Sequence, residues 1–154
     1  MELSAILRPE AVRVMSATSS KKRLFQEIGD MAHSAFGLDP SKVVDALMDR
    51  ESLGPTGVGH GVALPHARLE ELEQVVGGIV LLEKPIDFGA VDRQPIDIAF
   101  ALFAPLDAGV DHLKALARVS RTLRDSAVCA KLRANPDPAT MYTILTESSP
   151  VQAA

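Results

Sequence analysis

The sequence predicts an α/β fold in which helices cover the faces of a β-sheet. Residues 75–82 and 96–104 are apolar runs rich in β-branched and aromatic side chains, as expected of buried strands. Segments with helical periodicity precede and follow these runs, which favours a sandwich over a helical bundle or an all-β barrel. The chain has 154 residues, of which 47% are hydrophobic, and this is enough for one domain with its own core.

Two helices are expected before the strands. Residues 21–36 carry apolar side chains at the spacing of one helical face, and Gly37 provides a stop. Asp39 followed by Pro40 is typical of an N-cap and a first helical residue. A second helix is therefore expected from this point to about Arg50.

Both apolar runs are expected to be central strands. The first, residues 75–82, is bounded by Pro85, and the second, residues 96–104, is bounded by Pro105. Proline lacks the N–H that a sheet ladder needs, so it marks the limit of a central strand. A turn over residues 105–109 then leads into the helical C-terminal part.

A third, longer helix is expected to begin near His112. Arg118, Arg121 and Arg124 lie on a different face from the apolar stripe, which is typical of a solvated surface. Docking of a partner on these arginines is the second interpretation. The apolar stripe consists of Leu113, Leu116, Ala117, Ser120 and Leu123.

Two more helices are expected after the third. Asp125 or Ser126 can cap a short helix that runs through Leu132. Asp137, which precedes a proline, can cap a last helix through Leu145. We therefore expect one domain over residues 1–154, with a frayed tail from about residue 148 onward.

Composition limits the compartment and the partners. Cys129 is the only cysteine, so an internal disulfide is excluded and a reducing, cytoplasmic setting is expected. The 20 acidic and 16 basic residues give a net charge of -4, which argues against a nucleic-acid partner. No stretch approaches the length of a membrane span, so no membrane insertion is expected.

The most informative segment is residues 53–69, LGPTGVGHGVALPHARL. Glycines recur at every second position from residue 57 to residue 61, which lets an anionic group or another backbone approach closely. Pro65 restricts its own backbone and that of the preceding residue, so the side chain of His66 is expected to have a well-defined direction. This pattern points to phosphate chemistry on an imidazole.

The same residues resemble a known family, the type 2 IIA proteins of the bacterial phosphoenolpyruvate phosphotransferase system. This family includes mannitol, fructose and nitrogen-regulatory branches. The resemblance covers nearly the whole chain and is carried by SKKRLFQEIGDMA at residues 20–32, DRESLGPTGVGHGVALPHARL at residues 49–69, and the downstream PIDIAFALFAP and DHLKALARVSRTL. It implies a mixed-sheet α/β fold in which His66 accepts a phosphoryl group from an HPr-type phosphocarrier protein.

The nitrogen-regulatory branch is the nearest fit. The chain resembles a lone IIA unit with an N-terminal segment like ILRPEAVRVMSATSSKK, and it carries no IIB or membrane IIC sequence. Two departures from the family pattern concern the surface around the site. His60 stands where Asn is more usual, and Ala67 and Arg68 follow the histidine where many members have Gly and Lys.

Phosphoryl transfer requires that the nucleophile be held in position and that the negative charge on the phosphoryl oxygens be stabilised. A neutral imidazole is sufficient as the acceptor, and no metal or cofactor is required between two phosphohistidine proteins. His112 at a helix start can donate a hydrogen bond to phosphate, and Arg50 beside the glycine loop can add a charge-assisted one. The resemblance assigns both residues to this pocket. The hypothesis is that His66 is the nucleophile, with Arg50 and His112 as its helpers.

Each assignment has a structural alternative. His112 can instead cap its helix, and Arg50 can complement the negative end of its helix or pair with Asp49 or Glu51. His60 is expected to be a loop residue near the site rather than a participant.

Other reactive residues have simpler explanations. His33 and Cys129 are expected to be structural. A zinc site made by His60, His66 and His112 is disfavoured because the intervals lack a short ligand motif. A hydrolase is disfavoured because no GxSxG-like elbow supplies a nucleophile.

Two classes of function remain. In the first, the protein is a regulatory phosphocarrier whose partner proteins distinguish the phosphorylated from the unmodified state. In the second, it is a sugar-transport component of the fructose or mannitol type that passes the group from His66 to a separate IIB protein. The lack of fused IIB sequence favours regulation, while the target proteins stay unidentified.

Overall fold

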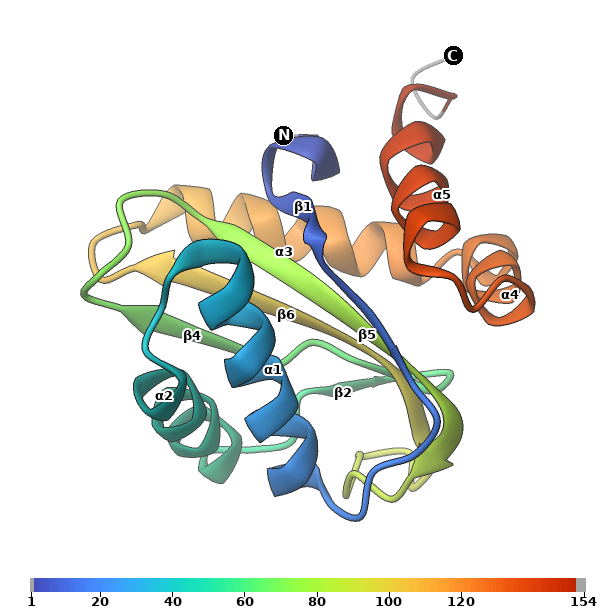
Figure 1. Ribbon diagram of the computed structural model, residues 1–154, viewed down its shortest axis with the longest axis horizontal. Helices are drawn as coiled ribbons and strands as arrows, with labels where there is room; N and C mark the ends of the chain where they lie inside the picture. Colours follow the sequence, from blue (N-terminus) through green and yellow to red (C-terminus); the bar gives the residue numbers. More distant parts are fainter. Residues whose placement is uncertain (1, 152–154) are drawn as a thin grey trace.

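Helices lie on both faces of a mixed β-sheet, as predicted (Figure 1). The computed structural model describes residues 2–151. Its elements are, in chain order, η1 (Leu3–Ala5), β1 (Leu7–Met15), α1 (Lys21–Phe36), α2 (Pro40–Ser52), β2 (Gly57–Gly59), β3 (Val62–Ala63), β4 (His66–Leu69), β5 (Val76–Ile86), β6 (Ile96–Pro105), α3 (Val110–Leu123), α4 (Ser126–Ala134) and α5 (Pro138–Val151). In Figure 1, α1 and α2 lie in front of the sheet and α3 runs behind it.

The sheet has the strand order β1-β5-β6-β3-β2. β5 is antiparallel to β6 and parallel to β1, so the sheet is mixed. β3 and β4 both pair in parallel with β6, one after the other along the same edge. The prediction that residues 75–82 and 96–104 form central strands is confirmed, because β5 and β6 have neighbours on both sides.

β5 and β6 bury consecutive residues because helices cover both faces of the sheet. β5 nevertheless continues past the expected limit at Pro85 and ends at Ile86. Its pairing with β6 has a register shift between Leu81 and Ile86, and residues 83–85 are exposed there. An exposed irregularity of this kind accommodates a residue without an N–H.

β1 was not predicted from the sequence. It carries Pro9 and Glu10 in its exposed part, and these residues interrupt any apolar alternation. Its register with β5 shifts between Leu7 and Val12. Because the irregular part faces solvent, packing of the two ends on β5 is enough to hold the strand.

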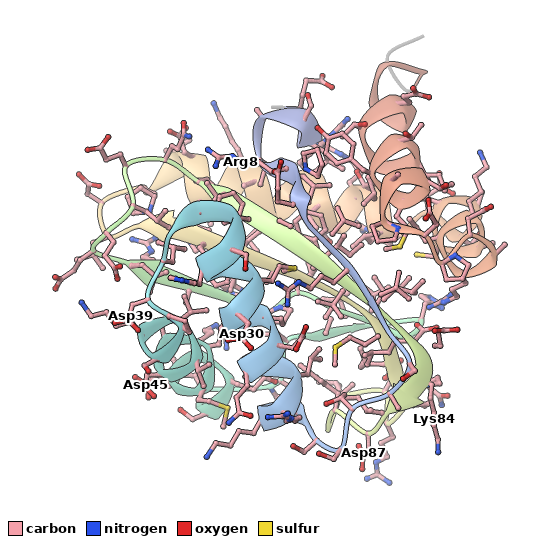
Figure 2. The ribbon with its side chains drawn as sticks, in the orientation of Figure 1. Arg8, Asp30, Asp39, Asp45, Lys84 and Asp87 are labelled. Atoms are coloured by element: carbon pink, nitrogen blue, oxygen red, sulfur yellow. The ribbon has the colours of Figure 1, made fainter. Side chains whose placement is uncertain are left out.

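The first two helices follow their predicted limits closely. α1 ends at Phe36 and is followed by Gly37, which adopts the left-handed conformation with φ 73°. The Asp39 side chain accepts a hydrogen bond from the N–H of Ser41 and caps α2, which ends at Ser52 rather than at Arg50. Asp30 and Asp45 lie on the exposed sides of these helices (Figure 2).

The last two helices begin where capping residues predict, whereas α3 has no side-chain cap and begins two residues before the expected start near His112. α3 begins at Val110, so His112 lies in its first turn. Asp125, rather than Ser126, caps α4. α5 continues past Leu145 to Val151, and residues 152–154 of the expected tail lie outside the described residues. No helix within residues 2–151 is long and apolar enough to cross a membrane.

Candidate functional site

His66 is the first residue of β4 and pairs with Leu102 of β6. The carbonyl of Pro65 accepts a hydrogen bond of 2.9 Å from the N–H of Leu102, which ties the backbone before the histidine to the central strand. The side chain of His66 is partly buried. A restricted proline and a central strand therefore hold this ring in one place.

One nitrogen of the His66 ring has a fixed partner. Nδ1 lies 2.8 Å from the carbonyl oxygen of Leu64. A carbonyl oxygen only accepts, so Nδ1 carries the proton in this hydrogen bond. In the neutral ring, Nε2 is then unprotonated, and its lone pair makes it the candidate nucleophilic nitrogen.

The pKa of His66 is lowered from its ordinary value. Burial of the ring is the main cause, and the positive charge of Arg50 acts in the same direction. The hydrogen bond to Leu64 and the charge of Glu51 raise the pKa but do not compensate. The ring is therefore neutral near pH 7, as a nitrogen nucleophile must be.

Arg50, in the last turn of α2, faces the free nitrogen of His66. Its Nε–H donates a hydrogen bond of 3.2 Å to His66 Nε2, and Nη1 donates one of 3.1 Å to the carbonyl of Gly54. The alternative ion pair with Glu51 is not formed, because the Glu51 carboxylate is bound by Lys21 and Thr56 instead. A fixed positive charge thus lies where a group attached to Nε2 would sit.

His112 approaches the same ring from the first turn of α3. The centroids of the His66 and His112 rings are 5.7 Å apart, with an interplanar angle of 69°. His112 is 6% exposed, and its Nε2 has no hydrogen-bond partner among the described residues. A buried polar atom without a partner is costly, so Nε2 of His112 is available for a ligand at this place.

The pKa of His112 is also lowered. Burial is the main cause, followed by the charges of His66 and Arg68. A neutral His112 can donate one hydrogen bond without bringing a second positive charge close to His66.

The fold explains how Arg50, His66 and His112 come together. α2 packs against β4, and β4 pairs with the last residues of β6. The chain then turns sharply from β6 into α3 at Gly109, whose φ of 52° a side chain rarely adopts. Three segments that are separate in sequence therefore meet at one end of β6.

Sequence reasoning missed the group that holds the loop beside Arg50. The Glu51 carboxylate is 6% exposed and accepts a hydrogen bond of 2.8 Å from Lys21 Nζ. It also accepts bonds from the N–H and the hydroxyl of Thr56, at 3.1 and 2.7 Å. The only sign of this contact in the sequence is a threonine five residues after a glutamate at the end of a helix, and this pattern is too common to predict a contact.

The structure does not bring His60 to the site. His60 lies exposed in the turn between β2 and β3, with φ 57°, and its carbonyl accepts a bond from Arg133. Val62 pairs with Ile98, four positions along β6 from the partner of His66, which corresponds to about 13 Å. His60, His66 and His112 thus form no common cluster, and residues 2–151 contain no group of three metal-binding side chains.

The other reactive residues have local partners. His33 is exposed on α1, and its Nδ1 lies 3.1 Å from the carbonyl of Leu38, just after the helix. Cys129 is buried in α4 and donates to the carbonyl of Leu123 at 3.1 Å. Burial raises the pKa of the Cys129 thiol, which keeps it protonated and unreactive.

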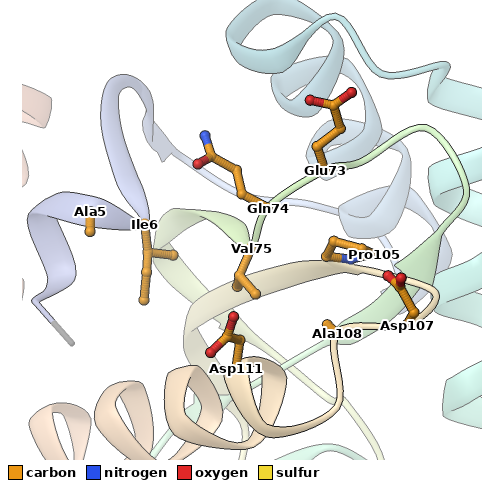
Figure 3. Close-up of a pocket in the computed structure, with 9 residues that line it drawn as sticks. All are labelled: Ala5, Ile6, Glu73, Gln74, Val75, Pro105, Asp107, Ala108 and Asp111. Atoms are coloured by element: carbon orange, nitrogen blue, oxygen red, sulfur yellow. The ribbon is translucent and has the colours of Figure 1, made fainter.

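A pocket of about 340 Å³ lies near the start of α3 but does not include the three candidate residues (Figure 3). Glu73, Asp107 and Asp111 contribute carboxylates to its lining. Their negative charge disfavours an anionic ligand there. An acceptor site for an anion is therefore better assigned to the neighbourhood of Arg50 and His112.

Comparisons with known proteins identify the family of this chain. Residues 5–148 match the family model of the phosphoenolpyruvate-dependent sugar phosphotransferase system, EIIA 2. The nitrogen regulatory protein of Bradyrhizobium diazoefficiens is 43% identical over 145 residues, which are 94% of this chain and 95% of that protein. The crystal structure of the nitrogen regulatory protein IIA-Ntr from Neisseria meningitidis has a TM-score of 0.86 and 30% identity, and the match covers 94% of this chain and 99% of that one.

A more distant structure shows the same fold. It is the complex of enzyme IIAMTL and phosphorylated enzyme IIBMTL from Escherichia coli, with a TM-score of 0.75 and 17% identity over 92% of this chain and 99% of the matched chain. The family match over nearly the whole chain and the relative at 43% identity decide the assignment. The chain belongs to the EIIA 2 family of the phosphoenolpyruvate-dependent sugar phosphotransferase system.

Proposed function

We propose that this protein is a phosphohistidine phosphocarrier of a nitrogen-regulatory phosphotransferase system. His66 Nε2 accepts a phosphoryl group from an HPr-type carrier, and partner proteins respond to the phosphorylation state. The observation that carries the proposal is the environment of one atom. Nε2 of His66 is unprotonated and accepts a hydrogen bond from the guanidinium of Arg50. The ring of His112, whose Nε2 has no partner among the described residues, lies 5.7 Å away between centroids.

The transfer needs no group beyond the two proteins. The lone pair of His66 Nε2 attacks the phosphorus of the donor phosphohistidine, a new N–P bond forms, and the old one breaks. The donor imidazole keeps the electron pair of the broken bond. The proton on Nδ1 of His66 stays in place, and the hydrogen bond that it donates to the carbonyl of Leu64 stabilises the positive charge of the phosphorylated ring.

Arg50 and His112 stabilise the transferred group. When Nε2 uses its lone pair to bond phosphorus, the Nε–H of Arg50 is released to a phosphoryl oxygen. Such charge-assisted hydrogen bonds contribute about 1.5–3 kcal/mol. Neutral His112 donates from Nε2, and the N-terminus of α3 adds its positive end.

Exposed apolar side chains near the site support a protein as phosphoryl donor. Leu53 follows the helix of Arg50 and is 83% exposed. Leu106, Val110 and Leu113, which flank the start of α3, are 54%, 63% and 65% exposed. We call these four residues the apolar rim. Large apolar side chains left open to water around a reactive group are typical of a docking surface.

The relatives support regulation as the output. Proteins named nitrogen regulatory protein match this chain over nearly their full length. The alternative is a transport component that passes its phosphoryl group to a separate IIB protein. The matched complex of IIAMTL with phosphorylated IIBMTL is the observation that favours this alternative.

Phosphorylation is tested with purified components. The protein is incubated with phosphoenolpyruvate, enzyme I and an HPr-type carrier, and acid-labile mass gain is followed by intact-protein mass spectrometry. His66→Ala is expected to abolish the gain, whereas His60→Ala and His33→Ala are matched histidine controls that retain it. A full mass gain on His66→Ala protein would refute the assignment of the acceptor.

The choice between regulation and transport needs a second experiment. Phosphorylated and unmodified protein are each immobilised, and proteins retained by only one form are identified. Delivery of the phosphoryl group to fructose-type and mannitol-type IIB domains is measured in parallel. Rapid and complete transfer to a IIB domain would overturn the regulatory output in favour of transport.

A further inference from the structure

We infer that Glu51 and Thr56 are positioning residues for His66, acting through the backbone of Leu64. This inference rests on the proposed function, because it concerns the presentation of the same nucleophilic nitrogen. It assigns a role to a buried acid and a buried hydroxyl that the transfer itself does not touch.

A continuous series of hydrogen bonds joins Glu51 to the ring. The Glu51 carboxylate accepts from the N–H and the hydroxyl of Thr56. The carbonyl of Thr56 accepts a bond of 2.9 Å from the N–H of Leu64. The carbonyl of Leu64 then accepts a hydrogen bond of 2.8 Å from the N–H of His66 Nδ1. The position of the Glu51 carboxylate therefore determines where the Leu64 carbonyl lies, and this carbonyl is the hydrogen-bond partner of His66 Nδ1.

Burial makes this series rigid. The Glu51 side chain is 6% exposed and Thr56 is 5% exposed, so water does not replace their mutual bonds. Lys21 Nζ neutralises the carboxylate at 2.8 Å and also lies 4.2 Å from the centroid of the Phe88 ring. Loss of these partners would leave a buried carboxyl group without its hydrogen bonds and counter-charge, which is strongly unfavourable.

The loop between α2 and β2 also orients Arg50, which contacts the other nitrogen of the His66 ring. Nη1 of Arg50 donates to the carbonyl of Gly54, two residues before Thr56. Arg50 and Glu51, which are neighbours at the end of α2, thus hold the loop at two points. Because Arg50 contacts Nε2 of His66 and Leu64 contacts Nδ1, this single loop sets the partners of both ring nitrogens.

The chemical consequence is control of the tautomer. A carbonyl held at Nδ1 keeps the proton on that nitrogen, so Nε2 keeps its lone pair. If Leu64 moves, the neutral ring can carry its proton on Nε2 instead, and this form is not nucleophilic at that atom. Loss of the Thr56 hydroxyl should therefore lower the fraction of correctly protonated ring before any phosphoryl donor is present.

The test reads the tautomer directly. Protein labelled with 15N in its histidines is examined by NMR above the pKa of the ring, where wild type should show a protonated Nδ1 and an unprotonated Nε2 on His66. Thr56→Val removes the hydroxyl at similar volume and should give a mixture of tautomers, whereas Thr56→Ser should restore the wild-type pattern. Phosphorylation by the HPr-type carrier should slow about 5- to 10-fold in Thr56→Val and recover in Thr56→Ser.

A matched control separates positioning from general stability. Asp97→Asn weakens an unrelated ion pair, that of Asp97 with Arg133, at the other end of β6. It should leave both the tautomer and the rate unchanged. If Thr56→Val does not fold, Glu51→Gln is read by the same spectrum and should also give mixed tautomers. A wild-type tautomer in the folded variants would overturn the inference, whatever the rate.

The two proposals fail in different ways. If wild-type protein gains no phosphoryl group, the proposed function fails, but the spectra of Thr56→Val and Thr56→Ser still decide whether Thr56 positions the ring. If wild-type protein is phosphorylated and the tautomer does not respond to Thr56, the function stands and the positioning role is refuted.

Discussion

The rings of His66 and His112 meet edge to face, with centroids 5.7 Å apart, although they belong to β4 and α3. Both pKa values are lowered, mainly by burial, and the charge of His66 contributes to the lowering at His112. Two imidazolium ions at this separation would repel each other. The pair is therefore neutral near pH 7, as the proposed roles of His66 as phosphoryl acceptor and His112 as hydrogen-bond donor require.

The first prediction concerns the pH profile of phosphoryl acceptance. Only the neutral ring of His66 is nucleophilic, and its pKa lies below the ordinary histidine value of about 6.5. The rate should therefore be highest at neutral and higher pH, and should fall as the pH is lowered, with a midpoint below the ordinary histidine value. Initial rates of mass gain, measured with purified phosphorylated carrier, test this. A midpoint at or above the ordinary histidine pKa would contradict the lowered value.

The second prediction concerns Arg50. Arg50→Ala should slow phosphorylation about 10- to 100-fold, because a charge-assisted hydrogen bond to the transferred group is lost. It should also raise the pKa of His66, since the positive charge of Arg50 contributes to its lowering. Stopped reactions give the rate, and NMR titration gives the pKa. Arg133→Ala removes an arginine of the Asp97 pair instead and should alter neither quantity.

The third prediction concerns His112. His112→Ala should slow phosphorylation about 10-fold while full mass gain is still reached, because the acceptor nitrogen remains. His112→Gln keeps an N–H donor and should retain part of the rate. Time courses of mass gain distinguish a lower rate from a lower end point. An unchanged rate for His112→Ala would remove this residue from the mechanism.

The fourth prediction concerns the apolar rim. Leu53→Ser or Leu113→Ser should raise the apparent KM for the phosphorylated carrier several-fold and leave kcat near the wild-type value, since apolar contact is lost but the site is intact. Val91→Ser is the matched control, because Val91 is 80% exposed and precedes β6, away from His66. Equal effects of all three substitutions would show that the rim has no special part in docking.

Much of the fold could be predicted because its signals are local. Gly37 and Asp39 mark helix ends by their own backbone and side-chain chemistry, and both act as predicted. β5 and β6 are recognisable because strands buried on both faces are continuously apolar. β1 could not be found in this way. Its segment contains Pro9 and Glu10, and only its pairing with β5 makes it a strand.

In the candidate site too, residues in local sequence patterns could be predicted, and residues whose partners are distant in sequence could not. His66 could be singled out from the sequence because Pro65 and the spaced glycines form a local pattern, and the family resemblance added Arg50 and His112. The environment of Glu51 was not predictable. Its buried carboxylate is neutralised by Lys21, which is 30 positions away in the sequence and is brought near only when α1 packs on α2. Short-range patterns carry no information about such a pair.

The last prediction concerns that pair. Lys21→Met should lower the free energy of unfolding by about 1–3 kcal/mol, because the Glu51 carboxylate, 6% exposed, would lose its counter-charge. Lys42→Met is the control, since Lys42 lies 4.0 Å from Glu71 and its side chain is 63% exposed, and its effect should stay below about 0.5 kcal/mol. Urea unfolding at neutral pH measures both. The double variant Lys21→Met with Glu51→Gln removes the uncompensated charge and should be more stable than Lys21→Met alone. If Lys21→Met and Lys42→Met lose equally little stability, the acid is not dependent on Lys21.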